Sequence, residues 1–351
     1  MVRITADFQQ ERVLHPAAMA LLNHSFSQGW ADPNKLNNNS RQTAILLQQV
    51  RQKFAELLDV RADEIEFSGE SDLGFELGIA GLLNAQSQMI YSAIDRQRVF
   101  AIAQSHEKNG NKVNCLPVDK NGVINLSTST ERDVLVWQVA NGETGNVQAN
   151  PKSQALIFAD CTASGVDYLP EFKYHTALFD SKSWQGPAGL GLLIIKDAEK
   201  WRNPSPHNDF SRSLGTYSIP LAIASSVALE AYLSDIDIRA KLKKLLMEFI
   251  SEQISDVDIA STENGLSKYL SCSFANVESD RLLLELEQLG FAVDSGSACK
   301  SADMQPSHVL AAMGRPIVGN IRLTLHKDIT EQMVVEFCQA LKISVEKLRK
   351  N

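Results

Sequence analysis

Six short, almost wholly apolar runs between residues 89 and 196 constrain the fold of this chain more than any other feature. Polar or helical segments separate them, and several lack the polar alternation of a half-exposed strand. Strands that are buried on both faces have this pattern, which is typical of parallel sheets covered by helices. The runs are MIYSAI (89–94), KVNCLPV (112–118), DVLVWQVA (133–140), ALIFAD (155–160), YHTALFD (174–180) and GLGLLIIK (189–196). The sequence therefore predicts an open, mostly parallel α/β sheet.

The pattern changes after about residue 245. Strand-like and helix-like segments follow one another from KYLSCSFANV to NIRLTLHK, and a last amphipathic helix is expected from Thr330. This order predicts a smaller α+β unit. Near the other end of the chain, apolar residues at helical spacing predict a helix over 41–58, with Ser40 as its N-cap.

Composition excludes some classes of function. The formal net charge of -8 argues against a nucleic-acid backbone as the main ligand. The N-terminus has no apolar signal segment and no run approaches the ~18 apolar residues of a membrane span, so we expect a soluble, cytoplasmic protein. The cysteines are scattered without C-x-x-C spacing, which argues against a disulfide framework and a zinc site. We expect Cys115, Cys272 and Cys338 to be buried packing residues.

Polar residues at the ends of the expected strands are the first candidates for a site, because ligands bind beyond the carboxyl ends of such strands. Ser68, Gly69, Glu70 and Ser71 join an expected strand to a helix. Their N–H groups and the Ser71 hydroxyl could hold an anion, although an ordinary capping serine would give the same pattern. Asp160 closes the run ALIFAD, where a carboxylate could keep a pyridine nitrogen protonated or could be a solvated loop residue.

Lys182 follows Asp160 by 22 residues, in the segment FDSKSWQGPAGLG. Most lysines are simply solvated. A rigid Gly-Pro-x-Gly-x-Gly turn directly after this lysine would, however, pin an amine that forms a Schiff base. The aspartate followed by the lysine is a more specific signal than either residue alone.

Cys299 and Arg322 are the candidates in the second half of the chain. Cys299 stands in DSGSACKSADMQPSHVL, a segment of small and polar residues that gives a thiol no reason to be there for packing. This indicates an accessible, reactive cysteine, with Lys300 favouring its thiolate. Arg322 lies inside the apolar strand NIRLTL and needs an anionic partner. The carboxylate of an amino-acid substrate and an internal salt bridge explain it equally well.

These segments together resemble the class V aminotransferase-like enzymes of fold type I, and within them the cysteine desulfurases. The resemblance covers nearly the whole chain and is strongest in SGSAC with its tail SADMQPSHVL, in GPAGLGLLII, in VANGETGNVQ and in NIRLTL. It implies a fold type I transferase: an N-terminal segment (1–15) on the small domain, a large cofactor-binding domain (16–245) and a small α+β domain (246–351). It also implies a homodimer, pyridoxal 5′-phosphate as cofactor, L-cysteine as substrate and a sulfur-acceptor protein as partner.

The resemblance assigns the cofactor contacts to particular residues. Lys182 matches the Schiff-base lysine, and Asp160 matches the partner of the pyridinium nitrogen. Ser71, with Gly69 before it, matches the phosphate-binding turn. Thr216 matches a threonine that reaches the phosphate of the neighbouring subunit.

On the substrate side, Arg322 matches the arginine that binds the substrate carboxylate. Cys299 matches the cysteine that carries a persulfide after sulfur leaves L-cysteine as L-alanine forms. A flexible loop is needed there, because one thiol must visit both the cofactor and an outside acceptor. The acceptor stays open, since iron–sulfur assembly, tRNA thiolation and cofactor biosynthesis would all fit.

Five positions depart from the family. Arg96 stands where a histidine stacks on the cofactor ring, and a guanidinium can stack but cannot exchange a proton near neutral pH. Ser181 replaces a histidine beside the lysine, and Ala163 replaces a glutamine that contacts the cofactor hydroxyl. Asp7 is not followed by the usual Ala-Thr-Thr, and Asn141, a cofactor- and substrate-contact position, is displaced within its Asn-Gly-Glu stretch. The cofactor anchors are kept while several groups that tune the substrate are not.

Two other functions stay open at this point. One is a different class V enzyme with the same cofactor, such as an aminotransferase, a lyase or a selenocysteine-processing relative, in which Cys299 would be incidental. The other is a non-catalytic dimer subunit or sulfur-relay scaffold, which the loss of the histidines allows.

Overall fold

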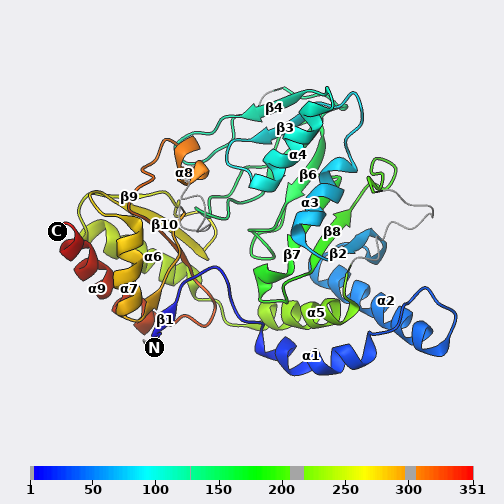
Figure 1. Cartoon of the computed structure of the whole chain (residues 1–351), viewed down its shortest axis with the longest axis horizontal. Coiled ribbons are helices and arrows are strands. Elements are labelled where there is room, and N and C mark those ends of the chain that lie inside the picture. The colour runs from blue at the N-terminus through cyan, green and yellow to red at the C-terminus, as the bar shows by residue number, and fades with distance from the viewer. Residues whose placement is uncertain (1–3, 127, 206–216, 297–305, 351) are drawn as a thin grey trace.

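Seven strands form one sheet at the centre of the large lobe, on the right in Figure 1. The computed structural model describes residues 4–126, 128–205, 217–296 and 306–350. The sheet order is β2-β8-β7-β6-β5-β3-β4. The strands are β2 (Ile65–Ser68), β3 (Met89–Ser92), β4 (Val113–Leu116), β5 (Val134–Gln138), β6 (Leu156–Asp160), β7 (Thr176–Asp180) and β8 (Gly191–Ile195). All pairings among β3 to β7 are parallel, and only β8 runs antiparallel to its neighbours β2 and β7. The predicted mostly parallel α/β sheet is confirmed.

Helices cover both faces of this sheet, as its apolar strands require. On one face α1 (Pro16–Gln28), α2 (Asn38–Leu58) and α5 (Ile219–Ser234) enclose a core that includes Phe54 and Trp184. On the other face α3 (Ser71–Ala80) and α4 (Gln97–Lys108) pack over a second core that contains Phe75 and Phe158. Figure 1 shows α1 and α5 side by side below the sheet, with α3 and α4 on the opposite side.

Helix α2 begins three residues before the expected start. Its N-cap is Asn37, whose side chain accepts a hydrogen bond from the N–H of Ser40 at 2.9 Å. The prediction of Ser40 as the cap is therefore wrong, because Ser40 is already a buried residue of the first turn. An asparagine satisfies the unpaired N–H groups of a helix start as well as a serine does.

The small lobe has its own core and its own antiparallel sheet, in the order β12-β10-β9. Its elements are β9 (Val257–Ile259), β10 (Tyr269–Phe274), β12 (Asn320–Thr324), α6 (Arg239–Gln253), α7 (Ser279–Gln288), α8 (His308–Ala312) and α9 (Glu331–Leu348). The expected boundary at residue 245 falls within α6, whose Leu242 and Leu246 both belong to this core. Strand β1 (Ala6–Asp7) pairs in parallel with β11 (Phe291–Ala292), so the N-terminal segment lies on the small lobe.

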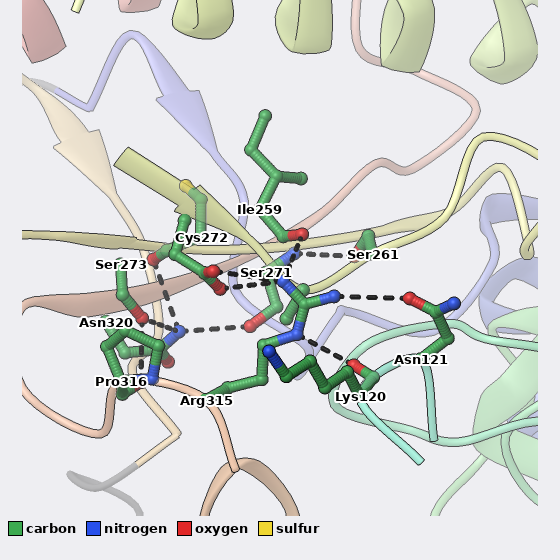
Figure 2. A network of polar contacts seen from close by, with 12 residues as sticks. Lys120, Asn121, Ile259, Ser261, Ser271, Cys272, Ser273, Arg315, Pro316 and Asn320 are labelled. Carbon is green, nitrogen blue, oxygen red and sulfur yellow. Dashed lines mark hydrogen bonds and ion pairs between the residues drawn. The ribbon is translucent and has the colours of Figure 1, made fainter. Parts of the chain in front are cut away.

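Arg315 joins the two lobes at the side of α8 (Figure 2). Its Nε donates to the carbonyl of Lys120 at 2.8 Å, and its Nη2 donates to the Asn121 side chain at 3.3 Å. Nη1 donates to both carboxylate oxygens of Asp258 on β9 at 3.0 Å. This arginine therefore holds a large-lobe turn against the small-lobe sheet.

The cysteines of the described residues divide into three that are buried and one that is exposed. Cys161, Cys272 and Cys338 are buried, and burial raises the pKa of each thiol. The prediction that Cys115 is buried is wrong, because Cys115 lies on β4, an edge strand of the large sheet, and is exposed.

No single helix among the described residues is long and apolar enough to cross a membrane. Helices α5 and α6 reach the length and apolar composition of a membrane span only when they are taken together, and the chain bends by 68° between them.

Candidate active site

A cleft lies where the carboxyl ends of the large-sheet strands face the small lobe. Its walls come from the N-terminal segment, the start of α3, the loops after β3, β6 and β7, and the start and end of the small-lobe sheet. The acidic and basic side chains that line it are Glu11, Arg12, Asp72, Arg96, Asp180, Lys182, Arg239, Lys268, His326 and Lys327. Leaving the histidine aside, lysines and arginines outnumber acids by six to three among these described residues. The cleft therefore favours an anionic ligand.

Asp160 ends strand β6 and is 1% exposed. Its Oδ1 accepts hydrogen bonds from the Thr162 N–H at 2.9 Å and from the Thr162 hydroxyl at 2.6 Å. Its Oδ2 is buried and has no hydrogen-bond partner among the described residues. Burying a carboxylate oxygen without a donor costs free energy, so this atom is the strongest local indication of a missing ligand.

Arg96 is the cation nearest to that oxygen. It precedes α4, and its Nε lies 3.5 Å from Asp160 Oδ2, too far for a good hydrogen bond. The Arg96 Nε is also buried without a hydrogen-bond partner among the described residues. The guanidinium lies beside Gly142, where a Cβ would be 3.4 Å from Nη2. Two complementary polar atoms thus lie close together, and neither is satisfied.

Lys182 belongs to the short 3-10 helix Ser181–Trp184, which Asp180 caps by accepting from the Lys182 N–H at 2.9 Å. Its side chain is 48% exposed, and its amine lies 3.6 Å from a carboxylate oxygen of Glu11. No ion pair joins Lys182 to Asp160 in the described part of the chain. Asp160 and Lys182 are connected only indirectly. Arg96 and Thr162, which contact Asp160, line the same cleft as Lys182.

Ser183, the next residue, points elsewhere. Its hydroxyl is buried without a hydrogen-bond partner among the described residues. It lies against Gly165, where an added Cβ would come within 2.5 Å of it. Of the polar residues in the 3-10 helix, Ser183 is therefore the one that faces the loop after β6. The sequence analysis did not single it out.

The predicted anion cradle forms the turn between β2 and α3. Glu70 occupies the N-cap position of α3 but makes no capping hydrogen bond with its side chain. Ser71 is the first helical residue, and it lines the cleft. The carbonyl of Gly69 packs against Gly189, whose φ of +82° needs glycine. The glycine-rich turn after Lys182 therefore packs against the turn between β2 and α3.

Asn141 was predicted as a cofactor and substrate contact, but its side chain is fully used within the protein. Its Nδ2 donates to Gln138 Oε1 at 2.9 Å and to the Ile94 carbonyl at 3.3 Å. Its Oδ1 accepts from the N–H groups of Glu143 and Thr144 at 2.9 and 3.0 Å. This geometry builds the turn after β5 and leaves no donor for a ligand.

Arg322 has an internal acidic partner. Its Nη2 lies 3.0 Å from Asp294 Oδ2, and its side chain is 11% exposed. Of the two explanations that the sequence left open, the structure contains the salt bridge. Cys299 and Thr216, the two remaining predicted residues, lie outside the described residues.

A buried charge cluster beside the cleft was missed by the sequence analysis. Asp167 accepts from Arg239 at 2.8 and 3.1 Å, from the Tyr232 hydroxyl at 3.0 Å, and lies 3.2 Å from the Lys268 amine. Burial alone would raise the pKa of Asp167, but Lys268 and Arg239 lower it to about 2. Lys268, at the start of a buried strand, was the available signal, because a lysine in that context needs a partner.

Known proteins resemble this chain in sequence and in fold. A family model described as aminotransferase class-V matches residues 14–337. The cysteine desulfurase IscS of Dictyoglomus turgidum is 26% identical over 91% of this chain and 89% of its own length. Cysteine desulfurase 2 of Trichormus variabilis is 27% identical over 91% of this chain and 87% of its own.

Solved structures share the fold. A NifS-like protein superposes with a TM-score of 0.85 over 99% of this chain and 100% of its own, at 21% identity. A NifS-like protein from Rickettsia africae gives a TM-score of 0.81 over 98% and 99% of the two chains, at 17% identity. The chain therefore belongs to the class-V aminotransferase family, the fold type I enzymes that include the cysteine desulfurases and depend on pyridoxal 5′-phosphate.

Proposed function

We propose that this chain is a cysteine desulfurase that moves sulfur from L-cysteine to Cys299 and releases L-alanine. The observation that carries the proposal is the buried Oδ2 of Asp160, which accepts no hydrogen bond from the described residues and lies beside a cleft whose walls are mainly basic. The names of the similar proteins supply the substrate class, and the cleft supplies the means to hold it.

The residues present fit the cofactor at two points. Asp160 Oδ2 lacks a donor, and a protonated pyridine nitrogen is a donor of the right charge. The N–H groups at the start of α3 and the Ser71 hydroxyl suit a phosphate. Lys182 lies in the same cleft with a half-exposed, flexible side chain, so its amine is free to turn from Glu11 toward an aldehyde. When bound, the cofactor supplies an electron-poor ring that accepts the electron pair released at the substrate.

The residues of the chain then have separate tasks. Asp160 keeps the proton on the ring nitrogen, and Lys182 takes and returns the proton at the substrate Cα. Arg322 binds the substrate carboxylate. The thiolate of Cys299 attacks the substrate sulfur, so that an S–S bond forms while the Cβ–S bond breaks. The β-carbon gains a proton in place of sulfur, so that L-cysteine and one thiol become L-alanine and one persulfide.

The assembly belongs to the same proposal. A homodimer would bring Thr216 to the phosphate of the neighbouring subunit, and an acceptor protein would collect the persulfide sulfur. Because Arg96 replaces a histidine, proton transfer at that position would pass to Lys182 or to water.

The test uses purified full-length protein loaded with pyridoxal 5′-phosphate. Alanine and sulfide are measured after L-cysteine is added with a thiol reductant. We expect both products from the wild type, and a loss of at least about 100-fold in Cys299→Ser, because a hydroxyl cannot form a persulfide. Equal alanine release by the two proteins would contradict the role of Cys299.

Borohydride reduction followed by peptide mapping tests the lysine directly. Lys182 and Lys268 both line the cleft, so the mapped peptide distinguishes them. We expect a pyridoxyl adduct on Lys182 and none in Lys182→Ala. An adduct on Lys268 would move the catalytic role to that residue.

One observation favours a second function. The Lys182 amine is paired with Glu11 rather than directed at the loop after β6, which Ser183 faces instead. A non-catalytic subunit that retains the fold would have such a lysine. Complete absence of an adduct, together with absence of alanine, would support that function and end the first.

A further inference from the structure

Arg322 and Asp294 are in contact through their backbones and through their side chains. Their backbones form an isolated antiparallel bridge, in which the Arg322 N–H donates to the Asp294 carbonyl at 2.7 Å. Their side chains form the ion pair at 3.0 Å, with exposures of 11% and 18%. The backbone bridge therefore fixes the carboxylate in front of the guanidinium.

Asp294 is also fixed from a third direction. Its Oδ2 accepts from the N–H of Gln10 at 2.7 Å, and Gln10 lines the cleft. One carboxylate oxygen thus connects the N-terminal segment to β12. The residues that follow Asp294 lead directly into the segment that contains Cys299.

Arg322 lies directly behind the wall of the cleft. Thr324 is two residues further along β12 and so is on the same face of the strand, and it lines the cleft. The Thr324 hydroxyl is buried and has no hydrogen-bond partner among the described residues. A ligand that reached the guanidinium from this wall would find the Asp294 carboxylate already in contact with it.

The Asp294 side chain and the α-carboxylate of an amino acid are the same chemical group. A guanidinium grips either one in the same planar fork geometry, so the two compete for Arg322. The internal carboxylate is held in place, whereas the substrate arrives from dilute solution. A substrate can bind only those molecules in which the arginine is not paired with the internal carboxylate. The apparent dissociation constant is therefore the intrinsic constant divided by the fraction of such molecules.

We propose that Asp294 is an internal competitor for Arg322 and thereby sets the affinity of this site for the substrate carboxylate. This inference rests on the proposed function, because it takes Arg322 as the group that binds the substrate. It assigns a specificity role to a residue that lies outside the predicted site. The consequence is a cleft that binds L-cysteine weakly until the ion pair opens.

The experiment compares wild type with Asp294→Asn, both loaded with cofactor. Asparagine keeps the shape and the acceptor for Gln10 but removes the charge. Binding is measured by calorimetry with L-alanine, the unreactive product, and steady-state kinetics are measured with L-cysteine. We expect the dissociation constant for L-alanine and the KM for L-cysteine to fall about tenfold, with a much smaller change in kcat, because the change acts on binding before the reaction.

The matched control is Asp258→Asn. Asp258 pairs with Arg315 at the same 3.0 Å, but this pair lies at the junction of the lobes drawn in Figure 2 and does not line the cleft. We expect no change in either constant. A second probe, cysteamine, has the amine and thiol of cysteine without the carboxylate, and its binding should not respond to Asp294→Asn.

A double variant shows whether the gain passes through Arg322. Arg322→Gln should weaken L-alanine binding, and adding Asp294→Asn to it should restore nothing. If Asp294→Asn binds L-alanine no more tightly than Asp258→Asn does, the inference is wrong while the proposed function stands. If the wild type and Asp294→Asn both bind no amino acid and release no alanine from L-cysteine, the proposed function is wrong and the inference falls with it.

Discussion

Two aspartates, one at the end of β6 and one in the loop after it, have opposite surroundings. Asp160 ends β6 and has one carboxylate oxygen without a hydrogen-bond partner among the described residues. Asp167 lies seven residues further along, and its carboxylate meets Arg239, Lys268 and the Tyr232 hydroxyl. Asp160 thus has a carboxylate oxygen without a hydrogen bond, whereas both carboxylate oxygens of Asp167 accept hydrogen bonds.

The difference separates a ligand site from a structural one. An unsatisfied buried oxygen costs about 1–3 kcal/mol, so its presence is best explained by a ligand that supplies the donor. A saturated acid has no capacity left for a ligand. Asp167 and Tyr232 belong to the large lobe, whereas Lys268 and Arg239 begin elements of the small lobe, so Asp167 joins the two. The two acids therefore predict different consequences when they are replaced.

The largest effect is expected on stability, from Asp167→Asn. The change removes the acid that the buried Arg239 and Lys268 share, although Arg239 keeps Asp237 as a second acidic partner. Removing one member of a buried ion pair costs about 3–5 kcal/mol, and we expect a loss at the lower end of this range. The free energy of unfolding is measured by denaturant titration of the cofactor-free wild type and variant. Glu230→Gln is the control, because Glu230 forms a shorter but exposed pair with Lys53 at 2.7 Å and should lose less than about 1 kcal/mol. Equal losses in the two variants would remove the distinction between Asp167 and a surface ion pair.

The next effect is expected on cofactor affinity, from Asp160→Asn. A neutral amide does not stabilise the positive charge of a pyridinium. We therefore expect the dissociation constant for pyridoxal 5′-phosphate to rise about 100-fold, a loss of about 2.7 kcal/mol in binding free energy. The stability of the cofactor-free protein should change less than in Asp167→Asn, because Oδ2 accepts no hydrogen bond from the described residues and its ion pair with Arg96 is long, at 3.5 Å. Equilibrium dialysis measures the constant.

Asp72→Asn sharpens this result. Asp72 lines the same cleft but is exposed and pairs with Arg98 at 3.3 Å. Removing its charge relieves repulsion of the phosphate, so affinity should stay the same or rise slightly. A loss in Asp72→Asn as large as in Asp160→Asn would mean that any carboxylate of the cleft supports the cofactor.

The large sheet could be predicted from the sequence because its strands are buried on both faces. Runs such as LIFAD and GLLII have no polar alternation, and all six expected runs are strands of one sheet. Asp160, Lys182 and Ser71 could be named as site candidates because each lies at or just after the carboxyl end of a strand. The error at Cys115 has the opposite cause: β4 has the composition of a buried strand but lies at the edge of the sheet.

The contacts between distant segments could not be predicted. Asp294 and Arg322 are 28 residues apart, and Asp167 and Lys268 are 101 apart, so no local pattern connects them. The sequence indicated that Arg322 needed an anion but did not identify which one. Likewise, the resemblance assigned Asn141 a ligand contact but gave no sign that its side chain would hydrogen-bond to Gln138, to the Ile94 carbonyl and to the N–H groups of the turn after β5.

The smallest effect tests the charge of Asp167 through acid. Its pKa is lowered to about 2 in the folded protein, whereas an unfolded aspartate titrates near ~3.9. As the pH falls toward ~3.9 the unfolded chain takes up this proton before the folded protein does, so the stabilisation of about 2.6 kcal/mol is complete above pH ~5 and is lost as the pH falls through about 2. Asparagine does not titrate, and the other acids are shared by wild type and Asp167→Asn. The difference in unfolding free energy between the two proteins should therefore shrink between pH 5 and pH 2. A difference that stays constant over this range would show that Asp167 acts through its shape and hydrogen bonds rather than through its charge, and the contrast with Asp160 would then lose its electrostatic basis.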